Sequence, residues 1–134
     1  MMQRAGYFVV VLLLLLLPLP GCQNGPAMGT VQGEVTFEGQ PLKKGAIRFV
    51  PVDGNSPTAG AIIQDGHFTA EVPVGLMRVE INASRVVGQR RAYAAADSPL
   101  ENEVEAIIPK QFNQNSTLRL TVHRGTQTVH YDLK

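Results

Sequence analysis

The stretch TAGAIIQDGHFTAEV, residues 58–72, decides the fold. Asp65-Gly66 at its centre favours a type I′ turn, because both central positions of that turn need a positive φ. Runs that alternate apolar and polar residues flank the dipeptide, near 59–64 and 67–72. Alternation with a period of two residues is the pattern of a half-buried strand, so the stretch predicts a β-hairpin.

The same alternation continues on both sides of this hairpin. Turn residues such as Glu38-Gly39-Gln40-Pro41 and Asp53-Gly54-Asn55 separate the runs. Besides the hairpin strands, strands are expected near residues 31–38, 46–50, 76–83, 118–122 and 129–133. The last two are expected to form a hairpin about Arg124-Gly125. About seven short strands with regular turns indicate an all-β chain, an immunoglobulin-like antiparallel β-sandwich.

One long connection, residues 85–105, interrupts this rhythm. Ser98-Pro99-Leu100-Glu101 within it has the form of a capped helix start, which predicts a short helix over 99–106. The sequence VEAII at its end fits an edge strand equally well. Connections of this length in compact domains tend to be functional loops or disordered segments. The connection begins basic, with Arg85, Arg90 and Arg91, and ends acidic, with Asp97, Glu101, Glu103 and Glu105.

The chain begins like a signal peptide. Arg4 supplies one positive charge, and an apolar run from Tyr7 to Leu17 follows it. Pro18 ends that run well before the roughly 20 apolar residues that a membrane-spanning helix needs. Leu19-Pro20-Gly21-Cys22 then resembles a bacterial lipobox, in which the cysteine thiol receives a diacylglycerol.

That resemblance implies cleavage between Gly21 and Cys22 and acylation of Cys22 with fatty acids such as palmitate. Two or three acyl chains exceed the roughly two signals that stable membrane attachment needs. An ordinary secretory peptide with a chance cysteine, or a free structural thiol, is the alternative. The expected organisation is a signal peptide over 1–21, a lipidated cysteine with a flexible tether over 22–30, and one domain over 31–134.

Composition excludes several classes of protein. Cys22 is the only cysteine, so the exported domain has no disulfide, thiolate nucleophile or cysteine metal site. Without Arg4, 11 lysines and arginines face 11 acidic residues. A balanced charge lacks the basic excess expected of a nucleic-acid-binding protein, so no nucleic-acid partner is expected.

Three blocks in order, GEVTFEGQPLKKGAIRFVP (33–51), AIIQDGHFTAEVPVGLMRVEI (61–81) and IIPKQFNQNSTLRLTVHRGTQTVHYDL (107–133), carry a family resemblance. They resemble the small lipoproteins of planctomycete bacteria that contain a carboxypeptidase-regulatory-like, transthyretin-like β-sandwich. Met77 and Phe112 stand where those chains usually have tyrosine. The resemblance implies the prealbumin-like fold and an accessory or interaction role, without a defined activity.

The residues suggest no catalytic or metal site. In the expected last hairpin His123 and His130 come close, but two histidines lack the third protein ligand that zinc or copper normally needs. No serine lies in a G-x-S-x-G turn, and Glu101, Glu103 and Glu105 are typical of a solvated charge run. We therefore expect neither enzymatic activity nor a cofactor.

The sequence thus predicts an exported protein anchored by lipid in the cell envelope, expected at the outer membrane and facing the periplasm or the surface. Its first expected role is a non-catalytic structural or interaction module with an envelope protein as partner. The alternative is a module that binds a carbohydrate or small ligand, for which Tyr93 is the one loop aromatic. The residues expected to bind a partner are Arg85, Arg90, Arg91 and Tyr93.

Overall fold

The computed structural model describes Gly21 and residues 25–134. Cys22 and the leader 1–20 lie outside the described residues, so the lipobox and its cleavage stay predictions. The first strand begins at Met28, within the segment expected to be the tether.

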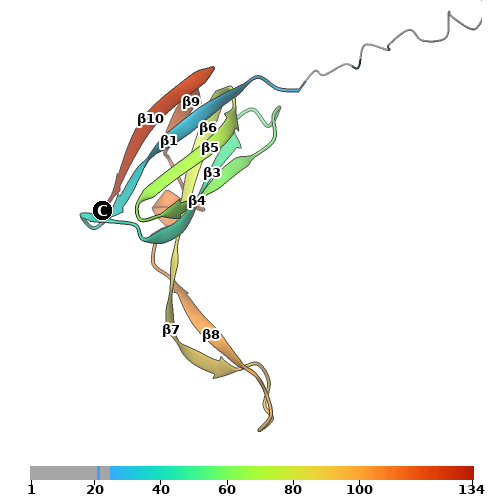
Figure 1. The fold of residues 1–134 in the computed structure, drawn as a ribbon, viewed down its shortest axis with the longest axis vertical. Helices are drawn as coiled ribbons and strands as arrows, with labels where there is room; N and C mark the ends of the chain where they lie inside the picture. The colour runs from blue at the N-terminus through green and yellow to red at the C-terminus, as the bar shows by residue number, and fades with distance from the viewer. Residues whose placement is uncertain (1–20, 22–24) are drawn as a thin grey trace, which may run out of the picture.

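The described chain is all-β, as the sequence predicts. Its strands form a two-layered body and one long arm, residues 84–106, that lies outside it (Figure 1). A single turn of 3-10 helix covers Lys110–Phe112. The strands are β1 (Met28–Phe37), β2 (Gln40–Pro41), β3 (Lys44–Pro51), β4 (Ala59–Gln64), β5 (His67–Pro73), β6 (Gly75–Asn82), β7 (Ser84–Arg91), β8 (Leu100–Ala106), β9 (Arg119–Val122) and β10 (Gly125–Leu133).

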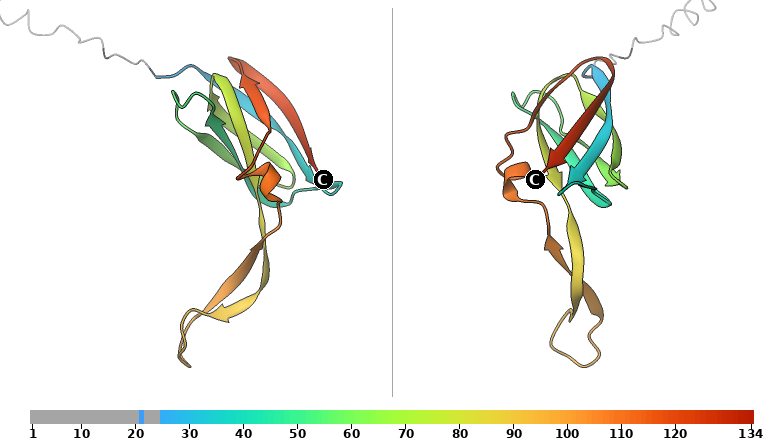
Figure 2. Two further views of the ribbon diagram at one scale, coloured as in Figure 1. Left: turned by 180° about the vertical axis from the view of Figure 1, so that it is seen from behind. Right: turned by 90° about the vertical axis from the view of Figure 1, so that its left-hand side faces the viewer.

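The body is one sheet that folds over on itself. Its strand order is β10-β1-β5-β4-β3-β6-β9, with β2 beside β1. Between β4 and β5 only Gln64 and His67 are register partners, on either side of the tight turn. The sheet therefore curls at this point, and β10-β1-β5 packs as one layer over β4-β3-β6-β9 (Figure 2).

The core fills the space between these layers. Phe49 of β3 and Phe68 of β5 meet across it, with ring centroids 6.2 Å apart. The long strands of the body point alternate side chains toward this space, as the period of two residues in a strand requires. The buried apolar residues are Val31, Val35, Leu42, Ile47, Phe49, Ile63, Phe68, Ala70, Val72, Met77, Val79, Ile81, Ile108, Val122 and Leu133.

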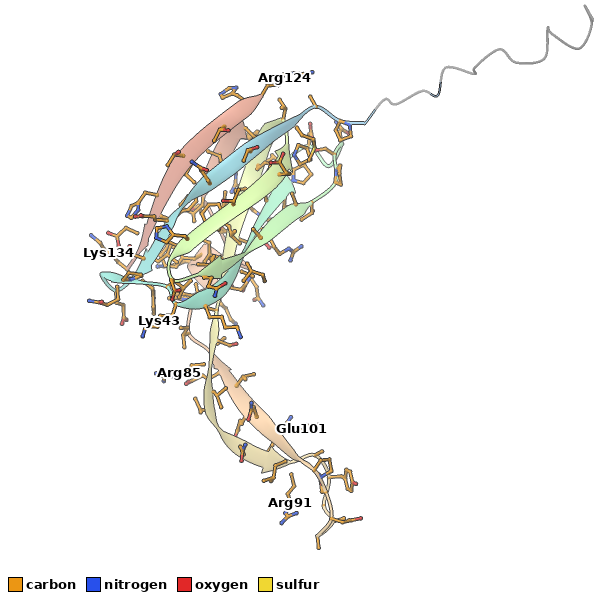
Figure 3. All side chains as sticks on the ribbon, viewed as in Figure 1. Lys43, Arg85, Arg91, Glu101, Arg124 and Lys134 are labelled. Carbon is orange, nitrogen blue, oxygen red and sulfur yellow. The ribbon has the colours of Figure 1, made fainter. Side chains whose placement is uncertain are left out.

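The expected hairpin of the last two strands is wrong. β9 pairs antiparallel with β6, whereas β10 crosses to the other layer and pairs parallel with β1. Both strands have the predicted alternation, but a period of two residues does not name the partner strand. Arg124 therefore lies in the link that joins the two layers. Figure 3 labels this residue, which marks that end of the body.

The expected short helix over 99–106 is also wrong. Leu100–Ala106 is strand β8, paired antiparallel with β7 over its whole length. The alternative, a strand at VEAII (104–108), is nearer to the structure, in which the strand begins earlier and ends at Ala106. Ser98 does not cap a helix; its hydroxyl oxygen accepts a hydrogen bond of 2.9 Å from the backbone N–H of Tyr93.

Gly33 marks a close approach between β1 and β10. A Cβ atom at this position would overlap the backbone carbonyl of Val129. We expect Gly33→Ala to lower the free energy of unfolding by about 1–3 kcal/mol, because the parallel strands must move apart to admit the methyl group. Chemical denaturation measures the change. Gly88→Ala is the matched control, since its Cβ would meet only a carboxylate oxygen of Glu103 at 3.8 Å; equal losses in both variants would contradict the prediction.

Tyr131 makes the stability depend on pH. Burial raises the pKa of its phenol from 10.0 to about 12. Between these pH values the unfolded chain binds fewer protons than the folded one, so the free energy of unfolding falls as pH rises from 10 to 12. Allowing for its partial exposure, we expect a loss of about 1 kcal/mol.

Urea unfolding at several pH values from 10 to 12 measures this loss. Tyr131→Phe removes it, whereas Tyr93→Phe, which alters an exposed residue of the arm, leaves it in place. A loss of the same size in the Tyr131→Phe chain would assign the effect to other groups.

Candidate interaction surface: the arm

The arm, residues 84–106, is a two-stranded ribbon that stands away from the body (Figures 1 and 2). β7 follows β6 after Ala83 alone, and the chain returns at Ile107, whose N–H donates a 3.0 Å hydrogen bond to the carbonyl of Ala83. β7 and β8 form a sheet of their own, so neither is a strand of the body sheet. None of the core residues belongs to the arm.

The two strands of the arm carry opposite charges. Arg85 lies opposite Glu105 in the register, and Arg90 lies opposite Glu101. The guanidinium of Arg85 is 3.0 Å from the carboxylate of Glu105, although both side chains are mostly exposed. Exposed pairs of this kind contribute little to stability, typically below about 1 kcal/mol. The charged side chains of the arm therefore add little to its stability and lie accessible to solvent.

The tip of the arm, residues 92–99, is held by polar contacts of its own. Besides the bond between Tyr93 N–H and Ser98, the guanidinium of Arg91 donates to the carbonyl of Ala96 at 2.8 Å. Ser98 is buried, whereas Tyr93 projects from the tip with 56% of its surface exposed. The tip is thus an ordered turn that presents one aromatic ring.

Apolar side chains on the arm face solvent. Val86 and Val104 lie opposite each other in the register, with 59% and 61% of their surfaces exposed. Leu100 is 60% exposed, and Val87 forms the bulge of β7. Side chains on a thin ribbon have no core beneath them, and clustered exposed apolar residues are a feature of interaction sites.

A groove lies where the arm meets the body. Its volume is about 560 Å³, and it is bordered by Val86 and Val104 of the arm and by Ile62 of the body, with Lys44 and Arg85 also in its lining. Ile62 is 68% exposed on β4, which pairs fully with β3 but with β5 only at the turn. The apolar surface of the arm therefore continues onto the body.

The structure brings the four predicted partner-binding residues onto this arm. Arg85, Arg90 and Arg91 lie on β7, and Tyr93 lies at the tip. Sequence reasoning missed the apolar pair Val86–Val104 and Ile62 beside it. The acidic residues of β8 are the ones that the sequence predicts to be a solvated charge run. Their spacing, Glu101, Glu103 and Glu105 at every second residue, was a signal for a strand with one charged face.

The expected approach of His123 and His130 does not occur. His123 lies in the link after β9, and its backbone N–H donates to the side chain of Gln127 at 2.6 Å. His130 faces Glu34 at 3.8 Å, and His67 faces the same carboxylate at 3.6 Å. Within residues 25–134 and Gly21, no group of three histidine, cysteine or acidic side chains is arranged to hold a metal ion.

The outer face of β10-β1-β5 satisfies its own polar groups. Thr30 donates to Glu71 at 2.6 Å, and Thr36 donates to Asp132 at 2.9 Å, each across neighbouring strands. Such cross-strand pairs stabilise a solvent-facing sheet and leave few unused donors. This face is therefore a weaker candidate for binding than the arm.

Comparison with families of proteins, with curated proteins and with solved structures finds no match. The resemblance to planctomycete lipoproteins therefore rests on the three sequence blocks. In the described part of the chain, no helix is long and apolar enough to cross a membrane.

We expect the body to fold without the arm. The hydrogen bond between Ile107 and Ala83 already has the geometry that closes a tight turn. We expect replacement of residues 84–106 by Asn-Gly, a type I′ turn, to change the free energy of unfolding by less than about 1 kcal/mol. Chemical denaturation and circular dichroism measure this. A chain that fails to fold without the arm would show that the arm is part of the folding unit.

Proposed function

We propose that this chain is an exported lipoprotein of the bacterial cell envelope, held on a membrane through acylated Cys22. Its β-sandwich acts as a non-catalytic support that presents the arm to a partner. The observation that carries the proposal is the position of the arm: it leaves the body at the end opposite to the one where β1 begins (Figure 1).

The register supports this geometry. β1 begins beside the start of β10, with Gly29 opposite Gly125. β6 begins near the same end, with Gly75 opposite Val122, and it runs the length of the body before the arm starts. β6 and β7 have eight residues each, so the tip reaches up to about 50 Å from the end where the tether enters. In Figure 3, Arg124 and Arg91 mark the two ends.

A protein anchored through its N-terminal segment would thus hold the arm away from the bilayer. The arm carries the exposed features that a partner needs. Tyr93 lies at its tip, and its strands carry the arginines of β7 and the apolar pair of Val86 and Val104. Recognition residues on a loop with a rigid support are a common arrangement. An envelope protein is the partner that this mixed charged and apolar surface fits best.

A glycan is the second candidate, favoured by the exposed ring of Tyr93 at the tip. Sugar faces stack on aromatic side chains, and binding platforms use such rings for that purpose. Tyr93→Ala abolishes binding on a glycan array if this alternative holds. It leaves protein contacts through the strands of the arm largely intact.

The anchor and the arm are tested by separate changes in the full chain. We expect metabolic labelling with palmitate to mark the chain, and Cys22→Ala to remove the label and shift the protein to the water-soluble fraction. Replacing residues 84–106 by Asn-Gly should keep the label and remove crosslinked partners in the native envelope. Unchanged crosslinks without the arm would refute its role, and an unlabelled chain with a free thiol at Cys22 would refute the anchor.

A further inference from the structure

We propose that the partner of the arm is a second copy of this chain: the basic β7 of one copy pairs edge to edge with the acidic β8 of its neighbour. The inference deepens the proposed function and rests on it, because it takes the copies to stand side by side on one membrane.

Both strands of the arm have a free edge. Within the described residues, β7 pairs only with β8, and β8 pairs only with β7. In a ladder of two strands, the outward-facing N–H and C=O groups of each strand have no strand partner and can accept another strand. A ribbon of two strands alone is also only marginally stable in water, so a third strand stabilises it.

Charge decides which edges fit together. β7 carries Arg85, Arg90 and Arg91 and no acidic residue. β8 carries Glu101, Glu103 and Glu105 and no basic residue. Pairing β7 with β7, or β8 with β8, sets like charges side by side, which is unfavourable. Only β7 against β8 of another copy places arginines beside glutamates.

The orientation of the copies gives the correct strand direction. β7 runs away from the body and β8 runs back towards it. In two copies with the same orientation on one membrane, β7 of the first is therefore antiparallel to β8 of the second. When the two bodies lie at the same distance from the membrane, Arg90 of one copy lies opposite Glu101 of its neighbour. The same two positions are register partners within one arm.

The apolar face of the arm is extended by the same contact. Val86 and Val104 are opposite each other in one arm, and the next arm continues the row with its own Val104 beside Val86. Val86 and Val104, each more than half exposed in one chain, then have an apolar side chain on both sides. The contact is heterologous, so it generates rows or rings of copies and not a closed pair.

Cysteine crosslinking tests this arrangement, because Cys22 is the only cysteine of the natural chain. Gln89 and Asn102 are exposed register partners at the middle of the arm. We expect a full chain with Gln89→Cys, co-expressed with a full chain with Asn102→Cys, to give a disulfide-linked heterodimer in the membrane fraction. Each variant alone should give roughly tenfold less, since like positions in a row are separated by an intervening strand, beyond the reach of a disulfide.

Two controls keep the test specific. Thr69→Cys with Thr128→Cys places exposed thiols on the body and should give only the background of chance collisions. A charge-swapped chain exchanges the arginines of β7 and the glutamates of β8, so pairs within one arm survive. Two swapped chains should crosslink with each other. A swapped chain should crosslink roughly tenfold less with an unswapped chain, because β7 of one would face a β8 of like charge in the other.

The outcomes separate this inference from the membrane anchor. A membrane-bound chain without the heterodimer overturns arm pairing and leaves the anchor standing. A heterodimer from chains that carry Cys22→Ser, at high concentration in solution, supports pairing even where the full chain proves not to be anchored. Crosslinks from Gln89→Cys to a different protein in place of the heterodimer assign the edge to a foreign partner and overturn the proposal.

Discussion

The contact of the two layers across Phe49 and Phe68 is the interaction on which the rest of the molecule depends. The domain has no disulfide to hold it, so burial of apolar side chains between the layers must supply its stability. The curl at Gln64 and His67 makes that burial available, because it lays β5 over β3. The arm depends on this packed body for its position and contributes no residue to the core.

Local signals identified most of the strands. Asp65-Gly66 is the turn between β4 and β5, with φ of 50° and 81°, as the dipeptide predicts. The pairing of β10 with β1 was beyond such reasoning, since the partners Gly33 and Val129 lie far apart in the sequence. Alternation shows which face of a strand is buried, but it does not show which strand lies beside it. The wrong hairpin at Arg124-Gly125, and with it the expected meeting of His123 and His130, has this cause.

The arm shows how a strong local signal can yield to pairing. Ser98-Pro99 has the form of a helix start, yet Ser98 instead bonds the backbone of Tyr93 across the tip. Strand β8 pairs with β7 over its whole length, and a helix over Leu100–Ala106 would lose this ladder of backbone hydrogen bonds. The residues predicted to bind a partner, Arg85, Arg90, Arg91 and Tyr93, lie on the arm, where charge and the one loop aromatic had placed the prediction. The groove beside Ile62 was not predicted, because it depends on how the arm leaves the body.

The entry of the chain through β1 and the exit of the arm after β6 have a mechanical consequence. Tension between the segment before Met28 and the arm would act along the strands and not across them. β1 lies between β5 and β10, with register partners on both sides from Gly29 to Glu34. Pulling would load these hydrogen bonds together in shear, so they could not open one after another as in unzipping. Force applied between the two ends would thus meet the resistance of both ladders of β1 at once.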